Sequence, residues 1–330
     1  LHFSMSVLLN WSHWQKVMRS AFAQSTLERA GLVLLLLTLT GAGCIRISTN
    51  TSSSEVYESV DGGKSWSSAD SVLTVNGSVA VLPLAKPAVF QFDPTDSKTL
   101  YFSTLDGGVY QTTNGAASWS VQRHSVEPLL AMDVDPQHPC TIYGSRVTRI
   151  EKSIDCGRRW ETLIQLPESL VVFTVRVNPQ HPNMIMAGTN RGDVYLSTDG
   201  GVQWVSPVRI PDRVGDILYS TGTVQDIYVS GLSGVLYRSS DAGKNWVDLS
   251  TPLRTLTASA PVTGIFLNPK KPEEIFVATQ RSIVHSTDRA TSWTQIPLLT
   301  TPDVTGIRTL AVDPQDARIL YYGNTTTLYR

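Results

Sequence analysis

The stretch that decides the fold is Ser197–Trp204, which reads STDGGVQW and follows the pattern Ser-x-Asp-x-Gly-x-x-Trp. An apolar run, Val194-Tyr195-Leu196, leads into it, and Trp204-Val205 leads out, so the chain must reverse between two strands. The Asp carboxylate can accept hydrogen bonds from backbone N–H groups of its own turn, and Gly adopts a positive φ at low cost. The Trp supplies a large apolar surface that fixes the hairpin to its surroundings. The pattern therefore predicts a tight turn between two antiparallel strands.

This pattern, which we call the Asp turn, occurs six times. The other copies are Ser59–Trp66, Thr112–Trp119, Ser153–Trp160, Ser239–Trp246 and Ser286–Trp293. Successive Trp residues lie 53, 41, 44, 42 and 47 residues apart, a period typical of a four-stranded propeller blade. The side chains at the third and eighth positions of each copy are expected to stabilise the turns. These residues are Asp61, Trp66, Asn114, Trp119, Asp155, Trp160, Asp199, Trp204, Asp241, Trp246, Asp288 and Trp293. Ala116 and Ala290 replace the Gly in two copies, so we expect those turns to be built differently.

A second repeated element lies between the Asp turns. It is a strand ending in Asp-Pro or Asn-Pro, a short polar loop and another strand, as in Val134-Asp135-Pro136 followed by Ile142-Tyr143-Gly144. Pro ends a strand without harm because its missing N–H is not needed in the turn. Each repeat is therefore expected to contain strand A, the Pro turn, strand B, strand C, the Asp turn and strand D.

The repeats predict an all-β fold, a single β-propeller of four-stranded blades over residues 55–330. The chain opens with a C–D pair at Val56–Ser67 and closes with an A–B pair at Thr305–Gly323. These halves can combine into one blade, which removes the free sheet edges. Six blades, closed by the N-terminal hairpin joining the C-terminal blade, are therefore expected. Thr327–Arg330 reads as a further strand C, so seven blades are the alternative.

Residues 1–43 are predicted to be a targeting segment. The apolar run Leu32 to Leu39 has eight residues, whereas a membrane-spanning helix needs about 20. Arg19 and Arg29 precede this run, as is typical of a signal peptide. Residues 1–17 fit neither the signal nor the fold, and Met18 is an alternative start of the translated chain.

Cys44 follows three small residues, and this junction resembles a bacterial lipobox. The resemblance implies that Cys44 receives a lipid after cleavage; an ordinary cleaved signal is the alternative. The Ser/Thr-rich composition of residues 44–54 suits a flexible tether. The expected protein is exported and anchored by its lipid on the extracytoplasmic face of a membrane, at the cell surface or in the periplasm.

Residues 55 to 330, with their six Asp turns, resemble the Asp-box (bacterial neuraminidase repeat) superfamily. The layout is most similar to propellers of the photosystem II stability and assembly factor type, and more distantly to sialidases, xyloglucan hydrolases and the sortilin ectodomain. The resemblance implies a propeller, but it does not specify function, because this fold serves enzymes and binding proteins alike.

A glycosidase needs converging carboxylates, and a sialidase also needs an Arg triad and a Tyr nucleophile. Val208-Arg209-Ile210-Pro211 is similar to a sialidase motif, but it follows the fourth Asp turn and lacks the leading aromatic residue. The Asp-turn carboxylates are expected to be used within their own turns. Glu273-Glu274 is interpreted as a solvated loop. We therefore predict no catalytic residues, with an exo-glycosidase of the sialidase or glucan hydrolase kind as the alternative.

The sequence predicts no cofactor, metal or nucleic-acid partner. No phosphate-binding loop, nucleophile elbow or Cys-x-x-Cys pair is present. His138 and His181 occupy matching Pro turns, where turn chemistry explains them better than metal binding does. The formal net charge is −1, without the basic excess that nucleic acid requires.

Two cysteines are placed to pair. Cys140 opens a strand B and Cys156 lies in the Asp turn that ends the next strand C. Because strand B runs antiparallel to strand C, the start of B should lie beside the end of C. Export favours oxidation, so a Cys140–Cys156 disulfide is predicted; two separate buried thiols are the alternative.

The opposite face carries the loops between strands B and C. These loops contain the residues Arg146, Arg149, Asn190, Arg191 and Arg281. They are predicted to form a basic rim that contacts a carboxylate-rich protein partner; solvated loop charges are the alternative. The favoured function is a non-catalytic, lipid-anchored propeller that binds a protein or assists complex assembly, and a surface glycan-binding or adhesion module is a further alternative.

Overall fold

The computed structural model describes residues 56–58, 65, 67–73, 79–82, 87–222, 225–258, 260–268, 270–298, 306–307, 309–312, 316, 318–323 and 328–329. The predicted signal segment (1–43), Cys44 and the tether (44–54) lie outside these residues, as does most of the first Asp turn, including Asp61 and Trp66. Within the described part, the longest helix is too short to cross a membrane.

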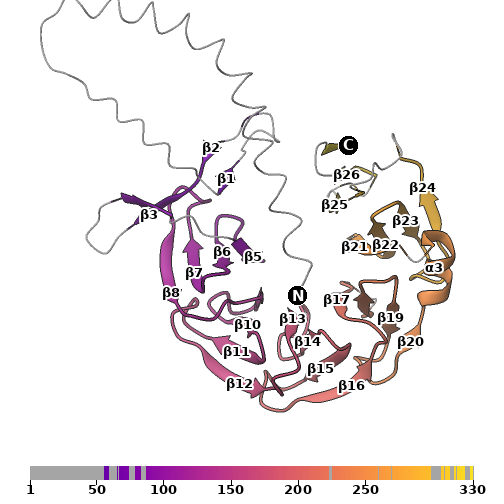
Figure 1. The fold of residues 1–330 in the computed structure, drawn as a ribbon, viewed down its shortest axis with the longest axis horizontal. Helices are drawn as coiled ribbons and strands as arrows, with labels where there is room; N and C mark the ends of the chain where they lie inside the picture. Colours follow the sequence, from indigo (N-terminus) through magenta and orange to yellow (C-terminus); the bar gives the residue numbers. More distant parts are fainter. Residues whose placement is uncertain are drawn as a thin grey trace, which may run out of the picture. The chain divides into compact units, whose positions relative to one another are not determined.

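Five antiparallel four-stranded sheets follow one another along the chain, each with its strands in sequence order (Figure 1). The first three are β5 (Pro87–Phe92), β6 (Leu100–Thr104), β7 (Gly108–Thr112) and β8 (Ser120–His124); β9 (Ala131–Val134), β10 (Ile142–Arg146), β11 (Arg149–Ser153) and β12 (Glu161–Gln165); and β13 (Val172–Val177), β14 (Ile185–Thr189), β15 (Asp193–Ser197) and β16 (Val205–Arg209). The next two are β17 (Val214–Tyr219), β18 (Ile227–Gly231), β19 (Leu236–Ser239) and β20 (Val247–Asp248); and β21 (Val262–Asn268), β22 (Lys271–Thr279), β23 (Ile283–Ser286) and β24 (Thr294–Ile296).

The predicted order of strands A to D is confirmed in these five sheets. In the sheet of β9 to β12, for example, Ile142 pairs with Val134 on one side and with Ser153 on the other. The Pro turn joins β9 to β10, and an Asp turn joins β11 to β12. Strands B and C are the most buried because each is covered on both faces, whereas the outer strand D is largely exposed.

Three smaller sheets complete the described strands. β25 (Thr309–Val312), β26 (Leu320–Gly323) and β27 (Leu328–Tyr329) form one, β1 (Tyr57–Glu58) pairs with β2 (Ser67–Ser68), and β3 (Ser71–Leu73) pairs with β4 (Val79–Val81). β27 occupies the place beside β26 that the sequence predicts for Val56–Glu58. Among the described strands, none from the N-terminal part pairs with one from the C-terminal part, so six blades and their closure stay predictions.

Successive sheets pack face to face. One core cluster joins Tyr143 and Ile150 of one sheet to Val175 and Ile185 of the next. The first strands of neighbouring sheets also contact one another, β9 with β13 and β13 with β17. Repeated four-stranded antiparallel sheets that pack in chain order through their first strands are the architecture of a β-propeller.

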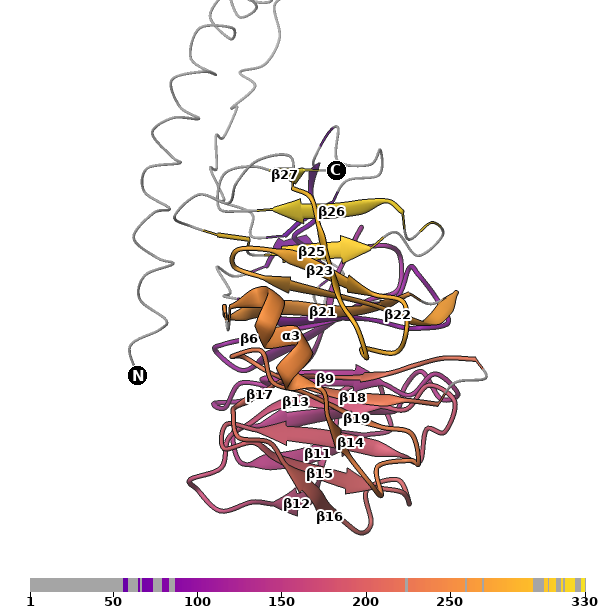
Figure 2. The same ribbon diagram turned by 90° about the vertical axis from the view of Figure 1, so that its right-hand side faces the viewer.

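Among the described residues, one helix interrupts the repeat, and it was not predicted. α3 (Ser250–Thr257) lies between β20 and β21 and packs along the sheet that precedes it (Figure 2). Leu253 is buried in the same cluster as Leu236. The helix ends at Ala258, whose φ of 49° is left-handed. The sequence signal is weak because Pro252 and three Thr residues favour turns over helix.

Candidate functional site

The Asp turns are structural. In Ser197–Trp204, the Ser197 hydroxyl donates to Asp199 Oδ1 at 2.8 Å and accepts from Gly201 N at 2.9 Å. Asp199 Oδ1 also accepts from Gln203 N at 2.9 Å, and these backbone and side-chain hydrogen bonds lower the pKa of Asp199. The same bonds recur in the turns of Asp155, Asp241 and Asp288. The carboxylates are therefore engaged within their turns, as the sequence predicts.

The two degraded copies keep the standard turn, so the expectation that they differ is wrong. In all five described turns the fourth and fifth residues have positive φ, and Ala116 and Ala290 reach 64° and 66° where the other copies have Gly. Their N–H groups donate to the Thr112 and Ser286 hydroxyls at 3.1 and 2.9 Å. These bonds and the Asp or Asn contacts outweigh the cost of a left-handed Ala, which is about 1–2 kcal/mol.

The Trp residues finish the turns in two ways. Trp160, Trp204 and Trp246 donate through Nε1 to the carbonyl of the fifth turn residue at 2.8, 3.0 and 2.9 Å. Trp119 is buried and donates instead to Ala69 O at 2.7 Å, which ties its turn to the N-terminal hairpin. Trp293 Nε1 is buried and has no partner in the described part of the chain.

The predicted Cys140–Cys156 disulfide is present, with Cα atoms 4.1 Å apart. It reinforces a backbone hydrogen bond that recurs in other sheets, in which the fourth turn residue donates to a carbonyl near the start of strand B; here Cys156 N donates to Cys140 O at 3.0 Å. Gly200 N donates to Asn183 O at 2.9 Å and Arg289 N to Glu273 O at 3.1 Å. The disulfide is thus a covalent version of a repeated backbone contact.

The predicted basic rim is only partly exposed. Arg146 is 1% exposed; its Nε donates to Glu151 at 2.8 Å, and its Nη1 donates to Glu127 O. Arg149 pairs with Glu127 and lies 3.4 Å from Glu151. Arg146 is therefore a structural residue and not a rim residue, because it ends a strand B, where the neighbouring sheets cover it.

Asn190 also serves the fold. Its Oδ1 accepts from Val171 N at 2.9 Å, and its Nδ2 donates to Ser169 O at 3.3 Å. Arg191 and Arg281 are exposed, and neither guanidinium has a partner among the described residues. Of the five predicted rim residues, these two present free charge to solvent.

Arg191 belongs to a cluster that the sequence analysis did not identify. Arg209 Nε donates to Arg191 O at 3.2 Å, and the Arg213 guanidinium lies over the Phe173 ring at 3.6 Å from its centroid. We call Phe173, Arg191, Arg209 and Arg213 the loop patch. Its members lie at the loop ends of β13 to β17, and the signal that could have revealed it is the run of Arg residues around Ile210-Pro211.

Two other sequence interpretations can be placed. In Val208-Arg209-Ile210-Pro211, Arg209 is exposed on the outer strand β16 and pairs with Asp193 at 3.5 Å. This location differs from the inner strands where carboxylates gather. His138 and His181 belong to Pro turns, where their N–H groups donate to Asp135 and Asn178 at 3.2 and 3.1 Å. No group of three metal-ligating side chains occurs among the residues that the structure describes.

Charged side chains also gather on the first strands (strand A) of neighbouring sheets. Arg176 on β13 pairs with Asp216 on β17 at 2.8 Å, while Asp133 on β9 accepts from Val177 N at 2.8 Å. Burial raises the pKa of Asp133 to about 6, against the opposing effect of Arg176. Burial also raises the pKa of Tyr219 well above its usual value, and its hydroxyl has no partner in the described structure. Charged residues within apolar strands A were the available sequence signal.

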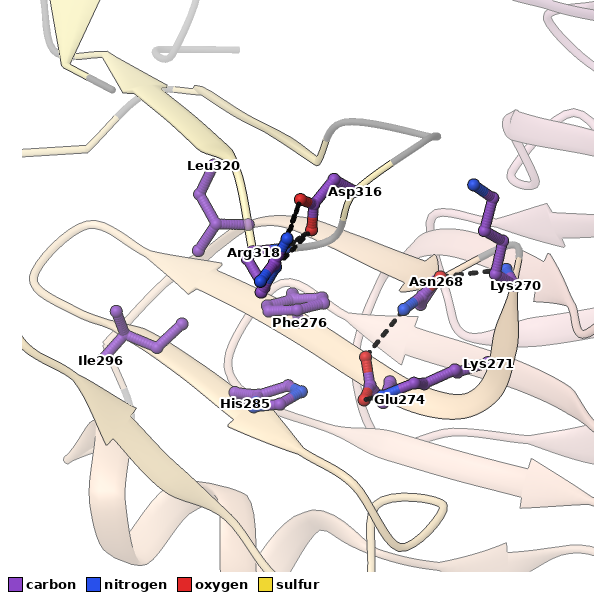
Figure 3. Close-up of a pocket in the computed structure, with 10 residues that line it drawn as sticks. All are labelled: Asn268, Lys270, Lys271, Glu274, Phe276, His285, Ile296, Asp316, Arg318 and Leu320. Carbon is purple, nitrogen blue, oxygen red and sulfur yellow. Dashed lines mark hydrogen bonds and ion pairs between the residues drawn. The ribbon is translucent and has the colours of Figure 1, made fainter.

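A groove of about 490 Å³ lies between β22 to β24 and the sheet of β25 to β27 (Figure 3). Its floor is the stacked pair Phe276 and His285, with ring centroids 4.4 Å apart. Burial lowers the pKa of His285. The opposite wall carries Arg318, which pairs with Asp316 at 2.6 Å. The groove thus combines an aromatic floor with polar walls.

Glu274 lines this groove and corrects the interpretation of Glu273-Glu274 as a solvated loop. Both residues belong to the extended strand β22. Glu274 accepts from Asn268 at 2.7 Å and Lys271 at 2.8 Å. Although burial opposes the shift, these hydrogen bonds lower the pKa of Glu274.

Comparisons with known proteins show the fold alone. No protein-family model and no curated protein matches the sequence. The GH74 enzyme of Niastella koreensis superposes with a TM-score of 0.61 at 15% identity, covering 73% of this chain and 44% of that chain. The GH74 xyloglucanase from Xanthomonas campestris gives 0.59 at 15% identity with the same coverage. A structure of YCF48 bound to D1 peptide gives 0.40 at 13% identity, covering 72% and 88%. The chain spans less than half the length of these GH74 enzymes.

Proposed function

We propose that this protein is a non-catalytic propeller that binds an anionic segment of a partner protein at the loop patch. The observation that supports it is the gathering of Arg191, Arg209 and Arg213 at one end of β13 to β17, with Arg213 stacked on Phe173. Asp212, the nearest carboxylate in sequence to Arg213, accepts from Ser233 N and Oγ at 2.6 and 2.8 Å. Arg209 pairs with Asp193 at 3.5 Å, whereas the exposed Arg191 guanidinium has no partner among the described residues, so the patch keeps a positive charge that is open to a ligand.

Such a patch suits carboxylate recognition. A guanidinium can donate two parallel hydrogen bonds to one carboxylate, and a cation held over an aromatic ring is already positioned for binding. Complementary charge mainly raises the association rate and the specificity. A segment rich in Asp, Glu or a free C-terminal carboxylate is the expected ligand class.

The test is capture of partners by chemical crosslinking in native membranes, followed by mass spectrometry. The double variant Arg191→Glu/Arg213→Glu should lose the partner, and binding should weaken as ionic strength rises. Arg159→Glu is the matched control, because Arg159 is an exposed arginine of an Asp turn, away from the loop patch. Equal capture by the double variant and the wild type would refute the proposal.

We also propose the finer classification that the sequence supports. The hydrogen-bonded Asp turns support membership of the Asp-box propellers, with a role in complex assembly, and the residues before Cys44 support a lipid anchor on an exported protein. The mass of the mature N-terminal peptide tests the anchor: it should carry diacylglycerol on Cys44. A mature chain that begins elsewhere or lacks the lipid would contradict it.

Glycoside hydrolysis is the second candidate, and one observation favours it. A glycosidase uses one protonated and one ionised carboxyl group, and the pKa of Asp133, about 6, would keep its carboxyl protonated in mild acid while Asp216 pairs with Arg176. Incubation with xyloglucan, β-glucans and fluorogenic sialosides tests this reading. Turnover that Asp133→Asn abolishes would establish the enzyme, and glycan binding without turnover would indicate an adhesion module.

A further inference from the structure

A bulge recurs near the loop end of strand A in four of the five four-stranded sheets. In each of them the pairing with strand B skips one residue of strand A. The skipped residues are Ala88 in β5, Phe173 in β13, Gly215 in β17 and Thr263 in β21. A bulge leaves the extra residue unpaired and re-aims its side chain. The residue type at this position therefore shapes the surface where one sheet meets the next.

Phe173 shows what this position does in the loop patch. Its ring lies under the guanidinium of Arg213, the residue directly before β17, with 3.6 Å between the guanidinium carbon and the ring centroid. At the next junction, where β17 contacts β21, the matching residues are Gly215 and Pro261. Neither the aromatic ring nor the guanidinium is therefore repeated at that junction.

A cavity of about 130 Å³ lies at the junction of β17 and β21, and we call it the bulge cavity. Its apolar lining consists of Gly215, Gly231, Leu232, Val262, Gly264 and Ile265. A Cβ on Gly215 would lie 3.3 Å from Leu232 Cδ2, so a larger side chain at the bulge would occupy this space. Glycine within a strand often marks a place where a ligand approaches closely.

The polar side chains of the lining do not compete for a ligand. Asp216 Oδ1 accepts from Arg176 Nη2 and from Ile217 N, both at 2.8 Å. Ser230 Oγ accepts from Asp216 N at 3.1 Å. Thr263 Oγ1 has no partner among the described residues, but this atom is itself buried and shielded from solvent. The surface that the bulge cavity offers to a ligand is therefore mainly apolar.

The volume of the bulge cavity suits one aliphatic side chain. An apolar cavity of about 150 Å³ binds benzene, so a cavity of about 130 Å³ can hold the side chain of a Val or Leu residue. Leu232, which is 39% exposed, continues the apolar lining to the protein surface. An exposed large apolar side chain beside a cavity is expected where a ligand covers it.

The position of the bulge cavity beside the loop patch indicates which ligand carries that side chain. Arg213 and Gly215 are two residues apart in the sequence, which corresponds to about 7 Å along a strand. The same distance separates residues i and i+2 of an extended peptide, whose side chains point to the same face. One extended segment can therefore place a carboxylate at Arg213 and an apolar side chain in the cavity.

We propose that the bulge cavity binds a Val or Leu side chain that lies two positions from a carboxylate in the anionic segment bound at the loop patch. This inference rests on the function proposed for the loop patch and adds sequence specificity to it. The arginines attract and orient the carboxylate, and burial of the aliphatic side chain favours segments with the correct spacing.

Binding of labelled synthetic peptides to the full chain, followed by fluorescence anisotropy, tests the proposal. Three peptides share a sequence of Asp, Gly and Ser: one has Leu two positions after an Asp, one has Leu two positions before it, and one has Ala in both places. One Leu peptide should bind the wild type about tenfold more tightly than the Ala peptide, because Leu buries three more carbons.

Substitution of Gly215 should remove this preference. Gly215→Phe introduces the side chain that Phe173 has at the matching bulge, and it should reduce the affinity of the Leu peptide to that of the Ala peptide. Gly215→Ala should reduce the preference in part, and it decides the question if Gly215→Phe does not fold. Gly215 has no positive φ, so its backbone accepts both side chains.

Two further variants separate the bulge cavity from the loop patch. Ala88→Phe places the same ring at the bulge of β5, outside the lining, and should keep the tenfold preference. Arg191→Glu/Arg213→Glu should weaken the binding of all three peptides. Thermal unfolding checks that each variant is folded.

The outcomes distinguish this proposal from the function on which it rests. Acidic peptides that bind the wild type without a preference for Leu, or a preference that persists in the folded Gly215 variants, would overturn the bulge cavity and leave the loop patch supported. A wild type that binds none of the three peptides would overturn both proposals.

Discussion

The buried ion pair of Arg146 and Glu151 yields the sharpest stability prediction. The Arg146 side chain is fully buried and that of Glu151 is 6% exposed, with Nε and Oε2 2.8 Å apart. We predict that Glu151→Leu destabilises the protein severely, whereas adding Arg146→Met to it restores most of the loss. The single substitution leaves a buried guanidinium without its counter-ion, and the double substitution leaves neither charge.

The expected changes in unfolding free energy follow from the geometry of this ion pair. At 2.8 Å and an effective dielectric constant of about 20, Coulomb attraction is about 6 kcal/mol, but removing both ions from water costs several kcal/mol for each. The net contribution of the intact pair is therefore small, while breaking a buried pair costs about 3–5 kcal/mol. The lower end is expected because Arg146 keeps its hydrogen bond to the Glu127 carbonyl. The double variant should fall within about 1 kcal/mol of the wild type.

Urea unfolding at pH 7, followed by tryptophan fluorescence, measures these differences as shifts of the midpoint at constant slope. Arg158→Met, at an exposed arginine of an Asp turn, is the control and should change stability by less than about 0.5 kcal/mol. The reasoning would be refuted by a Glu151→Leu variant that loses less than about 1 kcal/mol, or by a double variant no more stable than the single one.

Three further predictions follow from the turns and the inner strands. Replacing Cys140 and Cys156 by Ser should cost about 3 kcal/mol of unfolding free energy, measured by urea titration with Cys44→Ser as the control. The turn bonds lower the pKa of Asp241 from 3.8 to about 2, so the stability that they contribute is present above pH 3.8 and is lost as the pH falls toward 2. Asp241→Asn should therefore reduce the dependence of the unfolding free energy on pH in this range, and an unchanged dependence would contradict the prediction. Burial raises the pKa of Asp133 from 3.8 to about 6, so stability should fall as pH rises through this window, and Asp133→Asn should abolish that decline; a decline that persists would place its origin elsewhere.

The strands could be predicted because each repeat carries its own local signals. Pro and Asp turns mark both ends of the strand pairs, and those turns close with hydrogen bonds inside a single hairpin, such as Gln203 N to Asp199. The disulfide was predictable for the same reason, because pairing between adjacent strands places Cys140 beside Cys156. Helix α3 could not be predicted because its residues have low helix propensity. The helix is stabilised by the packing of Leu253 on a neighbouring strand.

The candidate sites were harder to predict because they join different repeats. The stack of Arg213 on Phe173 links the starts of β17 and β13, which lie about 40 residues apart in sequence, so no local pattern reveals it. Likewise, the ion pair of Arg176 with Asp216 joins β13 of one sheet to β17 of the next sheet. Such contacts depend on how neighbouring blades pack, and the sequence of one repeat does not specify which side chains of the next repeat lie against it.

Arg146 occupies a position, the end of strand B, that is also buried in other sheets. The residue that ends strand B is Thr104, Thr189 or Thr279 in three other sheets, and each is buried. Their hydroxyls accept from the turn to strand C, as Thr104 does from Gly108 N at 2.8 Å and Thr279 from Ser282 N at 3.0 Å. The position is therefore an internal cap in the repeat. A residue there is buried whatever its charge, so Arg146 required a buried acid, and Glu151 on the adjacent strand supplies it.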